Sequence, residues 1–116
     1  SLRESVRALD ADRAFHHVRF DQDGALVARS QVNLETLPAS KKYFMLTAAE
    51  EASKSVLREK HGCVIVRGRE ILARGHNKHV VKAVRGRISC HAEKDAILKC
   101  RKQRLDLRDA DLYVVR

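Results

Sequence analysis

Residues 63–74 read Cys-Val-Ile-Val-Arg-Gly-Arg-Glu-Ile-Leu-Ala-Arg, two short apolar runs on either side of a turn signal. The first run, Cys63–Val66, is typical of a buried strand, and the second, Ile71–Arg74, is typical of a strand that returns beside it. Gly68 opens the turn between them, where its backbone freedom favours a tight reversal. The sequence therefore predicts an antiparallel β-hairpin over residues 62–75.

A helix is predicted on each side of this hairpin in the sequence. The first covers about residues 41–59, with Ser40 as its N-cap after Pro38 and Gly62 as its stop signal. Its apolar face is formed by residues at helical spacing, Met45, Ala49, Ala52 and Val56. The second helix covers about residues 92–103 and turns three side chains inward, Ala96, Ile97 and Cys100. We expect both helices to pack against the hairpin and to bury three side chains, Val64, Val66 and Ala96.

A third strand is predicted at Leu112-Tyr113-Val114-Val115, another apolar run. The order of elements is then helix, strand, strand, helix, strand (α-β-β-α-β), which is typical of an α/β fold with a mixed sheet and helices packed on it. The natural continuation of such a strand is a further loop and helix that cover the sheet. We therefore expect residues 41–116 to form one domain that is incomplete at its C-terminal end.

Residues 1–40 differ in character from the rest, and we interpret them as an N-terminal appendage. A short helix is predicted over residues 1–13 from the helical spacing of Leu2, Val6 and Leu9. A small β-hairpin is predicted next, with strands at 15–20 and 25–28 around the turn signal Asp21-Gln22-Asp23-Gly24. Residues 30–39 are predicted to be an extended connection.

The composition limits the class of protein. The chain has 116 residues and a mass of 13.2 kDa, which suits one domain. No apolar run approaches the roughly 18 residues of a membrane-spanning helix, and no secretory signal is visible. The three cysteines, Cys63, Cys90 and Cys100, are too few and too irregular for a disulfide framework, and we expect buried thiols. These features predict an intracellular, reducing compartment such as the cytoplasm, the nucleus or an organelle matrix.

The positive charge is concentrated in the second half of the sequence. The net charge is +9, and residues 1–58 carry 9 basic and 8 acidic side chains against 15 and 7 in residues 59–116. Residues 75–90 are predicted to be a loop that includes four cations, Lys78, Lys82, Arg85 and Arg87. Such a segment favours contact with phosphate, in a nucleotide or a nucleic acid, although a solvated loop gives the same pattern.

The stretch His91-Ala92-Glu93 stands at the start of the second predicted helix. Backbone N–H groups and the helix dipole favour an anion or hydroxide at that position. A histidine there can hold zinc through its imidazole, and a carboxylate two residues on is then free to carry protons. An incidental helix start with Glu93 in the first turn is the alternative interpretation.

Four features occur along the chain in an order that one family shares. They are the helix at residues 42–52, the hairpin ending in Gly75-His76-Asn77, the stretch Cys90-His91-Ala92-Glu93, and the strand Asp111-Leu112-Tyr113-Val114. On these features, residues 41–116, about two-thirds of the chain, resemble the cytidine and deoxycytidylate deaminase superfamily. The branch that they resemble most is the deoxycytidylate type.

This resemblance implies a zinc-dependent hydrolase that deaminates cytosine in a nucleoside, a nucleotide or a nucleic acid. It implies that His91 is a zinc ligand and that Glu93 is the general acid and base. It also implies that Asn77 hydrogen-bonds the sugar or the base, and that the Ala92 backbone amide lies near the reacting exocyclic group. An adenine-directed deaminase is a variant of the same class that stays open.

The sequence departs from the family at the zinc ligands. The family supplies two further ligands from a Pro-Cys-x-x-Cys after the third strand, whereas the single proline here is Pro38 and no cysteine pair has that spacing. One imidazole does not hold zinc, because zinc sites use three or four protein ligands. We therefore expect the isolated chain to be metal-free and inactive unless a following segment or a partner chain supplies the missing ligands.

A second interpretation belongs to another class of protein. The chain is then a catalytically inactive subunit with the deaminase fold, kept for its basic surface as a structural or RNA- or DNA-binding component of a homo- or hetero-oligomer. The missing cysteines and the charge of residues 59–116 favour this interpretation, whereas the intact His91-Ala92-Glu93 favours the enzyme.

Overall fold

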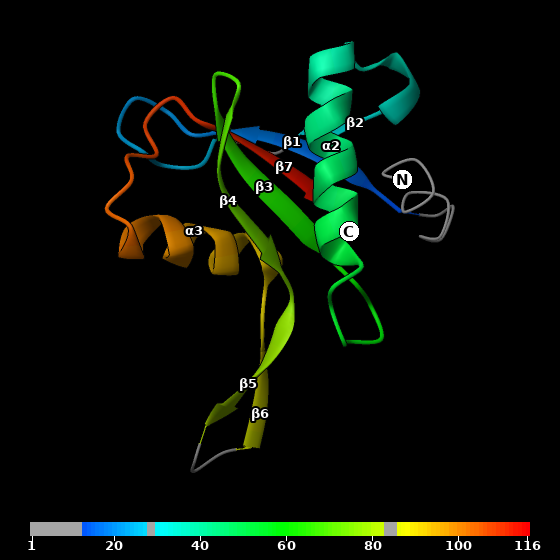
Figure 1. Ribbon diagram of the computed structural model, residues 1–116, viewed down its shortest axis with the longest axis vertical. Helices are drawn as coiled ribbons and strands as arrows, with labels where there is room; N and C mark the ends of the chain where they lie inside the picture. The colour runs from blue at the N-terminus through cyan, green and yellow to red at the C-terminus, as the bar shows by residue number, and fades with distance from the viewer. Residues whose placement is uncertain (1–12, 28–29, 83–85) are drawn as a thin grey trace.

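The computed structural model describes residues 13–27, 30–82 and 86–116, with the backbone path alone for residues 80–82 and 86–90. The short helix predicted over residues 1–13 lies outside these residues, apart from Arg13. The described elements form a five-stranded sheet with helices on it and a separate two-stranded ribbon (Figure 1). The predicted α/β fold with packed helices is therefore confirmed. The prediction of a mixed sheet was wrong, because β3 returns to β4 through a hairpin and every described strand pair is antiparallel.

The sheet has the strand order β2-β1-β7-β3-β4, and every neighbouring pair in it is antiparallel. Its strands are β1 (Phe15–Arg19), β2 (Ser30–Val32), β3 (Gly62–Arg67), β4 (Glu70–His76) and β7 (Asp111–Val115). The predicted hairpin is β3 and β4, in which Cys63 pairs with Gly75 and Arg67 pairs with Glu70. β7 matches the third predicted strand and pairs with both β3 and β1.

Two helices cover opposite faces of the sheet: α2 (Ala39–Ala52) and α3 (Ala92–Lys102). Alternate residues of a strand point to opposite faces, so each strand contributes to two cores. The core under α3 contains Cys63, Ile65, Leu112 and Val114, together with Ala96 and Cys100 of the helix. The core under α2 contains Val64, Val66, Tyr113 and Val115, together with Met45 and Ala49 of the helix.

Two glycines allow the helices to lie close to the strands. A Cβ atom at Gly62 would lie 2.3 Å from the backbone oxygen of Ala48 in α2. A Cβ atom at Gly75 would lie 2.3 Å from the backbone oxygen of Ala92 in α3. Neither position has room for a side chain, so these glycines fix the distance between each helix and the sheet.

The N-terminal hairpin is part of the sheet, which corrects its interpretation as an appendage. The turn over residues 21–24 is confirmed, with the Asp21 carboxylate accepting from the backbone N–H groups of Asp23 and Ala25. The return strand is β2 at Ser30–Val32, whereas residues 25–28 were predicted. The described part of that segment forms an isolated bridge from Leu26 to Phe20, and the N–H of Val27 donates to the backbone oxygen of Arg19. All five residues of β1 pair with β7, and that long-range pairing joins the hairpin to the domain.

α2 is shorter than predicted, and its termini differ. The N-cap position is Pro38 and not Ser40, the helix ends at Ala52 and not near residue 59, and Gly62 begins β3. Val56 lies beyond the helix and is 81% exposed, so it is not part of the apolar face. Hydroxyl groups explain the early end, because serine side chains compete with the helix for backbone hydrogen bonds. The Ser53 hydroxyl donates to the backbone oxygen of Glu50, and the buried Ser55 hydroxyl donates to the backbone oxygen of Asn77.

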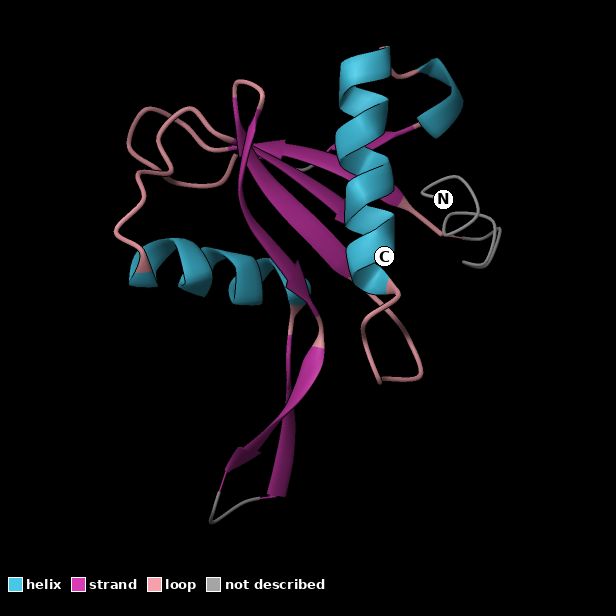
Figure 2. Ribbon diagram, viewed as in Figure 1, coloured by secondary structure: helices cyan, strands magenta, loops and turns pink. Residues whose placement is uncertain are grey.

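Residues 78–82 and 86–90 form a two-stranded ribbon, whereas a loop was predicted over residues 75–90. β5 (Lys78–Lys82) and β6 (Gly86–Cys90) pair with each other and, among the described strands, with none of the main sheet (Figure 2). The sequence contains Val80, Val81 and Ile88, and β-branched residues favour strands. The charged residues around these positions led to the prediction of a loop in place of two strands. The ribbon projects from the body of the domain (Figure 2).

Candidate functional site

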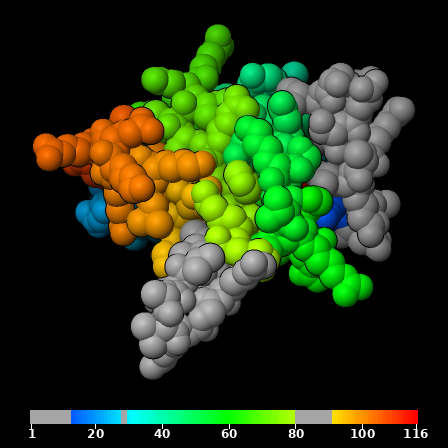
Figure 3. Space-filling model, turned by 60° about the horizontal axis from the view of Figure 1, so that its bottom comes forward, coloured from blue at the N-terminus to red at the C-terminus, as the bar shows by residue number. Residues whose placement is uncertain are grey.

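One end of the sheet brings together the elements that carry the predicted site. β3 begins there at Gly62, β4 ends there at His76, and β7 ends there at Val115. α2 ends and α3 begins beside this end. Figure 3 shows the loop after α2 (green), the end of β4 (yellow-green) and α3 (orange) on one face of the molecule.

His91 occupies the N-cap position of α3, with extended backbone angles of φ −68° and ψ 151° and an exposed side chain. The backbone oxygen of His91 accepts from the N–H of Asp95 at 3.0 Å, which closes the first helical turn. Glu93 and Asp95 are acidic residues in that turn, where the helix dipole favours negative charge. The buried residue Ala92 opens the helix, so its amide is one of the first-turn N–H groups that have no acceptor within the helix.

Glu93 is paired with Arg116. The Glu93 Oε2 atom lies 2.7 Å from a guanidinium nitrogen of Arg116, and the Glu93 side chain is only 13% exposed. Arg116 is held in place because its backbone N–H and oxygen both pair with Ala14, at 2.9 and 3.0 Å. The guanidinium therefore stabilises the ionised form of a carboxylate that is largely removed from solvent.

Asn77 is buried and holds the loop between α2 and β3. Its Oδ1 atom accepts from the backbone N–H of His61 at 2.8 Å, and its Nδ2 atom donates to the backbone oxygen of Glu59 at 2.6 Å. Its own backbone N–H donates to the oxygen of His61 at 3.2 Å. The side chain that was predicted to bind substrate is thus engaged with its own chain, and it fixes the position of His61 beside the site.

Three further polar residues at this end were not predicted: Glu51, His61 and Asp95. Glu51 is buried in α2 and lies 2.9 Å from the His76 Nδ1 atom. Asp95 is buried in α3 and accepts from the backbone N–H of His76 at 3.3 Å. The sequence did contain a signal for a polar cluster here. His61 and His76 flank the predicted hairpin of residues 62–75, and antiparallel pairing brings the two ends of a hairpin together.

The comparisons with known proteins agree with this arrangement. The family model of the cytidine and deoxycytidylate deaminase zinc-binding region matches residues 38–115. The chain belongs to this deaminase family. The match begins at Pro38, so it covers α2 through β7 and leaves out β1 and β2.

A solved structure shares the deaminase fold. The dCMP deaminase from the cyanophage S-TIM5, in complex with dCMP and dUMP, superposes with a TM-score of 0.53 at 23% sequence identity. The superposition covers 65% of this chain and 63% of that one, so the match spans less than two-thirds of the phage protein. No curated protein matches the sequence. Among the described residues, no helix is both long enough and apolar enough to cross a membrane.

Zinc requires more ligands than the described part of this deaminase chain provides. No group of three or more His, Cys, Asp or Glu side chains in the described residues is placed to hold a metal ion. Cys63 is unsuitable as a ligand because burial, with Glu93 and Asp95 nearby, raises the pKa of its thiol well above the usual value. That thiol donates to the backbone oxygen of Ala92 at 3.1 Å. The Cys100 thiol is buried in the core under α3, and burial raises its pKa as well. The described residues therefore do not complete a zinc site.

The electrostatics of the site favour the ionised forms of Asp95 and Glu51. Burial alone would raise the pKa of Asp95, but hydrogen bonds from Lys78, His76 and Lys99 outweigh it and hold that pKa below the usual value. Burial would likewise raise the pKa of Glu51, but the contacts with Lys54 and His76 lower it. His61 responds in the opposite way, because burial and the charges of Arg116 and Arg13 lower its pKa and favour the neutral imidazole.

The structure places one of the four predicted phosphate-contacting cations in an ion pair. Lys78 lies 2.8 Å from Asp95 Oδ1, so its charge already has a partner within the domain. The side chains of Lys82, Arg85 and Arg87 lie outside the described residues. Their contact with phosphate stays a prediction that rests on the charge of the ribbon sequence.

Proposed function

We propose that the chain supplies one half of a deaminase active site, which acts on cytosine in a deoxycytidylate-type nucleotide or in a nucleic acid. The observation that carries this proposal is the position of Glu93 in the first turn of α3. Glu93 is paired with Arg116, largely shielded from water and two residues after the N-cap residue His91. The family match over residues 38–115 supports the same class of reaction.

Glu93 is the residue that moves protons in the proposed reaction. Hydrolytic deamination adds water to the carbon that bears the exocyclic amine and releases that amine as ammonia. A carboxylate beside the ring takes the proton from the attacking water and returns protons to the ring nitrogen and to the departing ammonia. Only the ionised form can begin this cycle, and a guanidinium 2.7 Å away favours that form.

The positions around Glu93 suit the remaining roles. The amide of Ala92 lies at the helix start, where it can donate to a developing negative charge on the substrate. Asn77 keeps His61 beside the site and has amide hydrogen-bonding capacity left for a sugar hydroxyl. His91 is proposed as one zinc ligand, and at least two further ligands are required from residues other than those described.

The test joins a Pro-Cys-x-x-Cys segment after Arg116, loads the protein with zinc and measures ammonia release from dCMP, CMP and cytosine in single-stranded DNA. Glu93→Gln should lower the rate by about 100-fold or more, because it removes the proton carrier. Glu70→Gln, at an exposed position of β4, is the matched control and should keep the rate. If no substrate is deaminated, or if both variants behave alike, the proposal is wrong.

One observation favours a second candidate function, an inactive subunit that binds nucleic acid. The described residues hold no complete metal group, and residues 59–116 carry 15 basic against 7 acidic side chains. In that case the chain binds RNA or DNA with an affinity that falls steeply as salt rises, because phosphate contacts release counterions. A salt titration of binding, run beside the activity assay, distinguishes the two functions.

We also propose an intracellular, reducing location and an oligomeric assembly, in which a second chain completes the site. The support for the location is chemical, because Cys63 and Cys100 are both buried free thiols.

A further inference from the structure

A cavity lies at the opposite end of the sheet from His91. It has a volume of about 640 Å³ and is lined by Ser40, Lys41, Tyr43, Phe44, Gly68, Arg69, Asp111 and Tyr113. These residues come from the start of α2, the turn between β3 and β4, and the start of β7. The length of β3 separates the two ends, roughly 17 Å at ~3.4 Å per residue. A cavity of this size suits a small molecule.

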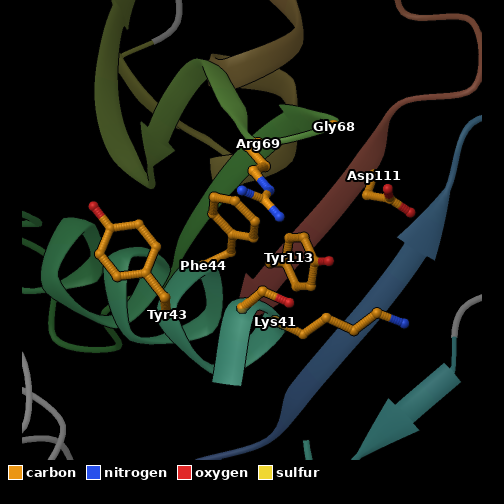
Figure 4. A pocket seen from close by; sticks show the side chains of 8 residues that line it. Lys41, Tyr43, Phe44, Gly68, Arg69, Asp111 and Tyr113 are labelled. Atoms are coloured by element: carbon orange, nitrogen blue, oxygen red, sulfur yellow. The ribbon is translucent and has the colours of Figure 1, made fainter. Parts of the chain in front are cut away.

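Two cations at this cavity have no acidic partner. Lys41 and Arg69 are both exposed, and neither forms an ion pair with any residue that the structure describes. The nearby carboxylate of Asp111 is already engaged, because it lies 2.8 Å from His17 and 3.7 Å from Arg19. In Figure 4 the Tyr113 ring lies between Arg69 and Lys41. The cavity therefore offers two uncompensated positive charges beside an aromatic ring.

The hydroxyl group of Tyr113 is the second, independent observation. Tyr113 is only 3% exposed, yet its hydroxyl has no hydrogen-bond partner among the described residues, and the residue lines the cavity. Its ring is fixed by stacking on His17, with centroids 4.7 Å apart, and by contact with Phe44 at 5.5 Å. Burial, with Asp111 nearby, raises the pKa of Tyr113 to about 12, so the group is a neutral donor. A buried tyrosine hydroxyl normally has a partner, and here the open side is the cavity.

The start of α2 adds a third source of positive potential at the cavity. Its N-cap residue Pro38 makes no side-chain hydrogen bond to the first turn, and that turn contains no acidic residue. The N–H groups and the dipole of this 14-residue helix therefore carry uncompensated positive charge where Ser40 and Lys41 line the cavity.

We propose that this cavity binds a phosphate monoester of a small compound with a flat ring. The phosphate lies between Lys41, Arg69 and the start of α2 and accepts a hydrogen bond from the Tyr113 hydroxyl. The ring packs on the exposed aromatic surface of Tyr43 beside Phe44, whose rings meet edge to face at 5.5 Å. The site is separate from the candidate active site and does not depend on the proposed deamination.

The test titrates the chain with phenyl phosphate, and with inorganic phosphate and phenol as separate arms, by isothermal calorimetry. Phenyl phosphate should bind at least about tenfold more tightly than either fragment, because both halves of the site contribute. Lys41→Gln and Arg69→Gln should each weaken it about fivefold to tenfold, and Tyr113→Phe about fivefold, as for the loss of one hydrogen bond. These substitutions keep the aromatic core, and circular dichroism checks that each variant is folded.

Two controls locate the site. Lys42→Gln removes the same charge from the neighbouring residue, which does not line the cavity, and should change the affinity less than twofold. Glu93→Gln lies at the other end of the sheet and should leave the binding unchanged. The proposal is overturned if Lys42→Gln weakens binding as much as Lys41→Gln, if Glu93→Gln alters it, or if inorganic phosphate binds as tightly as phenyl phosphate.

Discussion

The carboxylate of Glu93 and the guanidinium of Arg116 are 2.7 Å apart, although 23 residues separate them in the sequence. The pair connects the first turn of α3 to the end of β7, and the pairing of Arg116 with Ala14 extends the connection to the N-terminal hairpin. The geometry of the proposed proton carrier therefore depends on strands from both ends of the described chain.

Removal of this pair should destabilise the fold modestly. We expect Arg116→Gln to lower the free energy of unfolding by about 1 kcal/mol, since the pair is partly shielded from water. Arg101→Gln, at an exposed position of α3, removes the same charge. It should lower the free energy of unfolding by less than about 0.5 kcal/mol. Urea denaturation of the three proteins measures the difference, and equal losses for both variants would contradict a specific contribution from the pair.

His61 should titrate below its usual pKa of 6.5 in the folded protein. The unfolded chain then binds more protons than the folded chain in the interval below 6.5, so stability rises with pH across it and is lost as the pH falls through the folded pKa. A histidine proton resonance followed by NMR gives the midpoint. Arg116→Gln should move that midpoint upward, because it removes one of the charges that depress it. A midpoint at or above 6.5 in the parent protein refutes the prediction.

The contact of the buried Glu51 carboxylate with the partly exposed His76 should make stability fall in acid. The pKa of Glu51 is held below the usual 4.5, so its contribution is present above pH 4.5 and is lost as the pH falls through the folded value. We expect Glu51→Gln to cost about 1–3 kcal/mol at pH 6. Between pH 5 and pH 3, the free energy of unfolding of the Glu51→Gln variant should also change less than that of the parent protein. Parallel pH profiles for the two proteins would show that Glu51 is not responsible.

Among the four glycines whose surroundings the structure describes, Gly62→Ala and Gly75→Ala should be the most damaging substitutions. Each new methyl group would lie 2.3 Å from a backbone oxygen of a packed helix, which cannot move without disturbing its own hydrogen bonds. We expect losses of about 3 kcal/mol or more. Gly68→Ala is the control, because its space is open and only its φ of 61° opposes the change, at about 1 kcal/mol. In thermal melting, Gly62→Ala and Gly75→Ala should both unfold at lower temperatures than Gly68→Ala.

Zinc uptake should depend on residues added to the 116-residue sequence. We expect the chain alone to retain little zinc after gel filtration, because His91 has too few companions among the described residues. A Pro-Cys-x-x-Cys segment joined after Arg116 should raise the content toward one zinc per chain, and His91→Ala in that protein should lower it again. Elemental analysis provides the measurement. One tightly held zinc in the unextended chain would show that other ligands, such as Cys90 or a partner chain, complete the site.

The sequence was informative where neighbouring residues determine the structure and uninformative where distant residues do. α3, β3 and β4 follow from local periodicity and a glycine turn, and they were predicted within a residue or two. The pairing of β1 with β7 joins residues almost a hundred positions apart, and no local pattern encodes it. The early end of α2 has the same origin, because Ser55 leaves the helix to bond with Asn77 across 22 residues.

The candidate site shows the same division between local and distant information. The positions of His91 and Glu93 at a helix start were readable from a short motif. The partners that decide their chemistry, Arg116, His61 and Glu51, come from other elements and become neighbours only when the sheet forms. Asn77 was assigned by resemblance to substrate binding, and its hydrogen bonds to residues 59 and 61 could not be foreseen from the motif.

The position of β7 also has a consequence for the kinetics of folding. β7 pairs with β1 on one side and β3 on the other, yet it follows both of them in the sequence. On the ribosome, the two hairpins emerge first and must wait for residues 111–115 before either acquires its neighbour. Contacts between residues so far apart slow the crossing of the folding barrier, because loop closure must precede them. Until β7 arrives, the inner edges of β1 and β3 expose unpaired backbone groups, which makes this interval the one most vulnerable to aggregation.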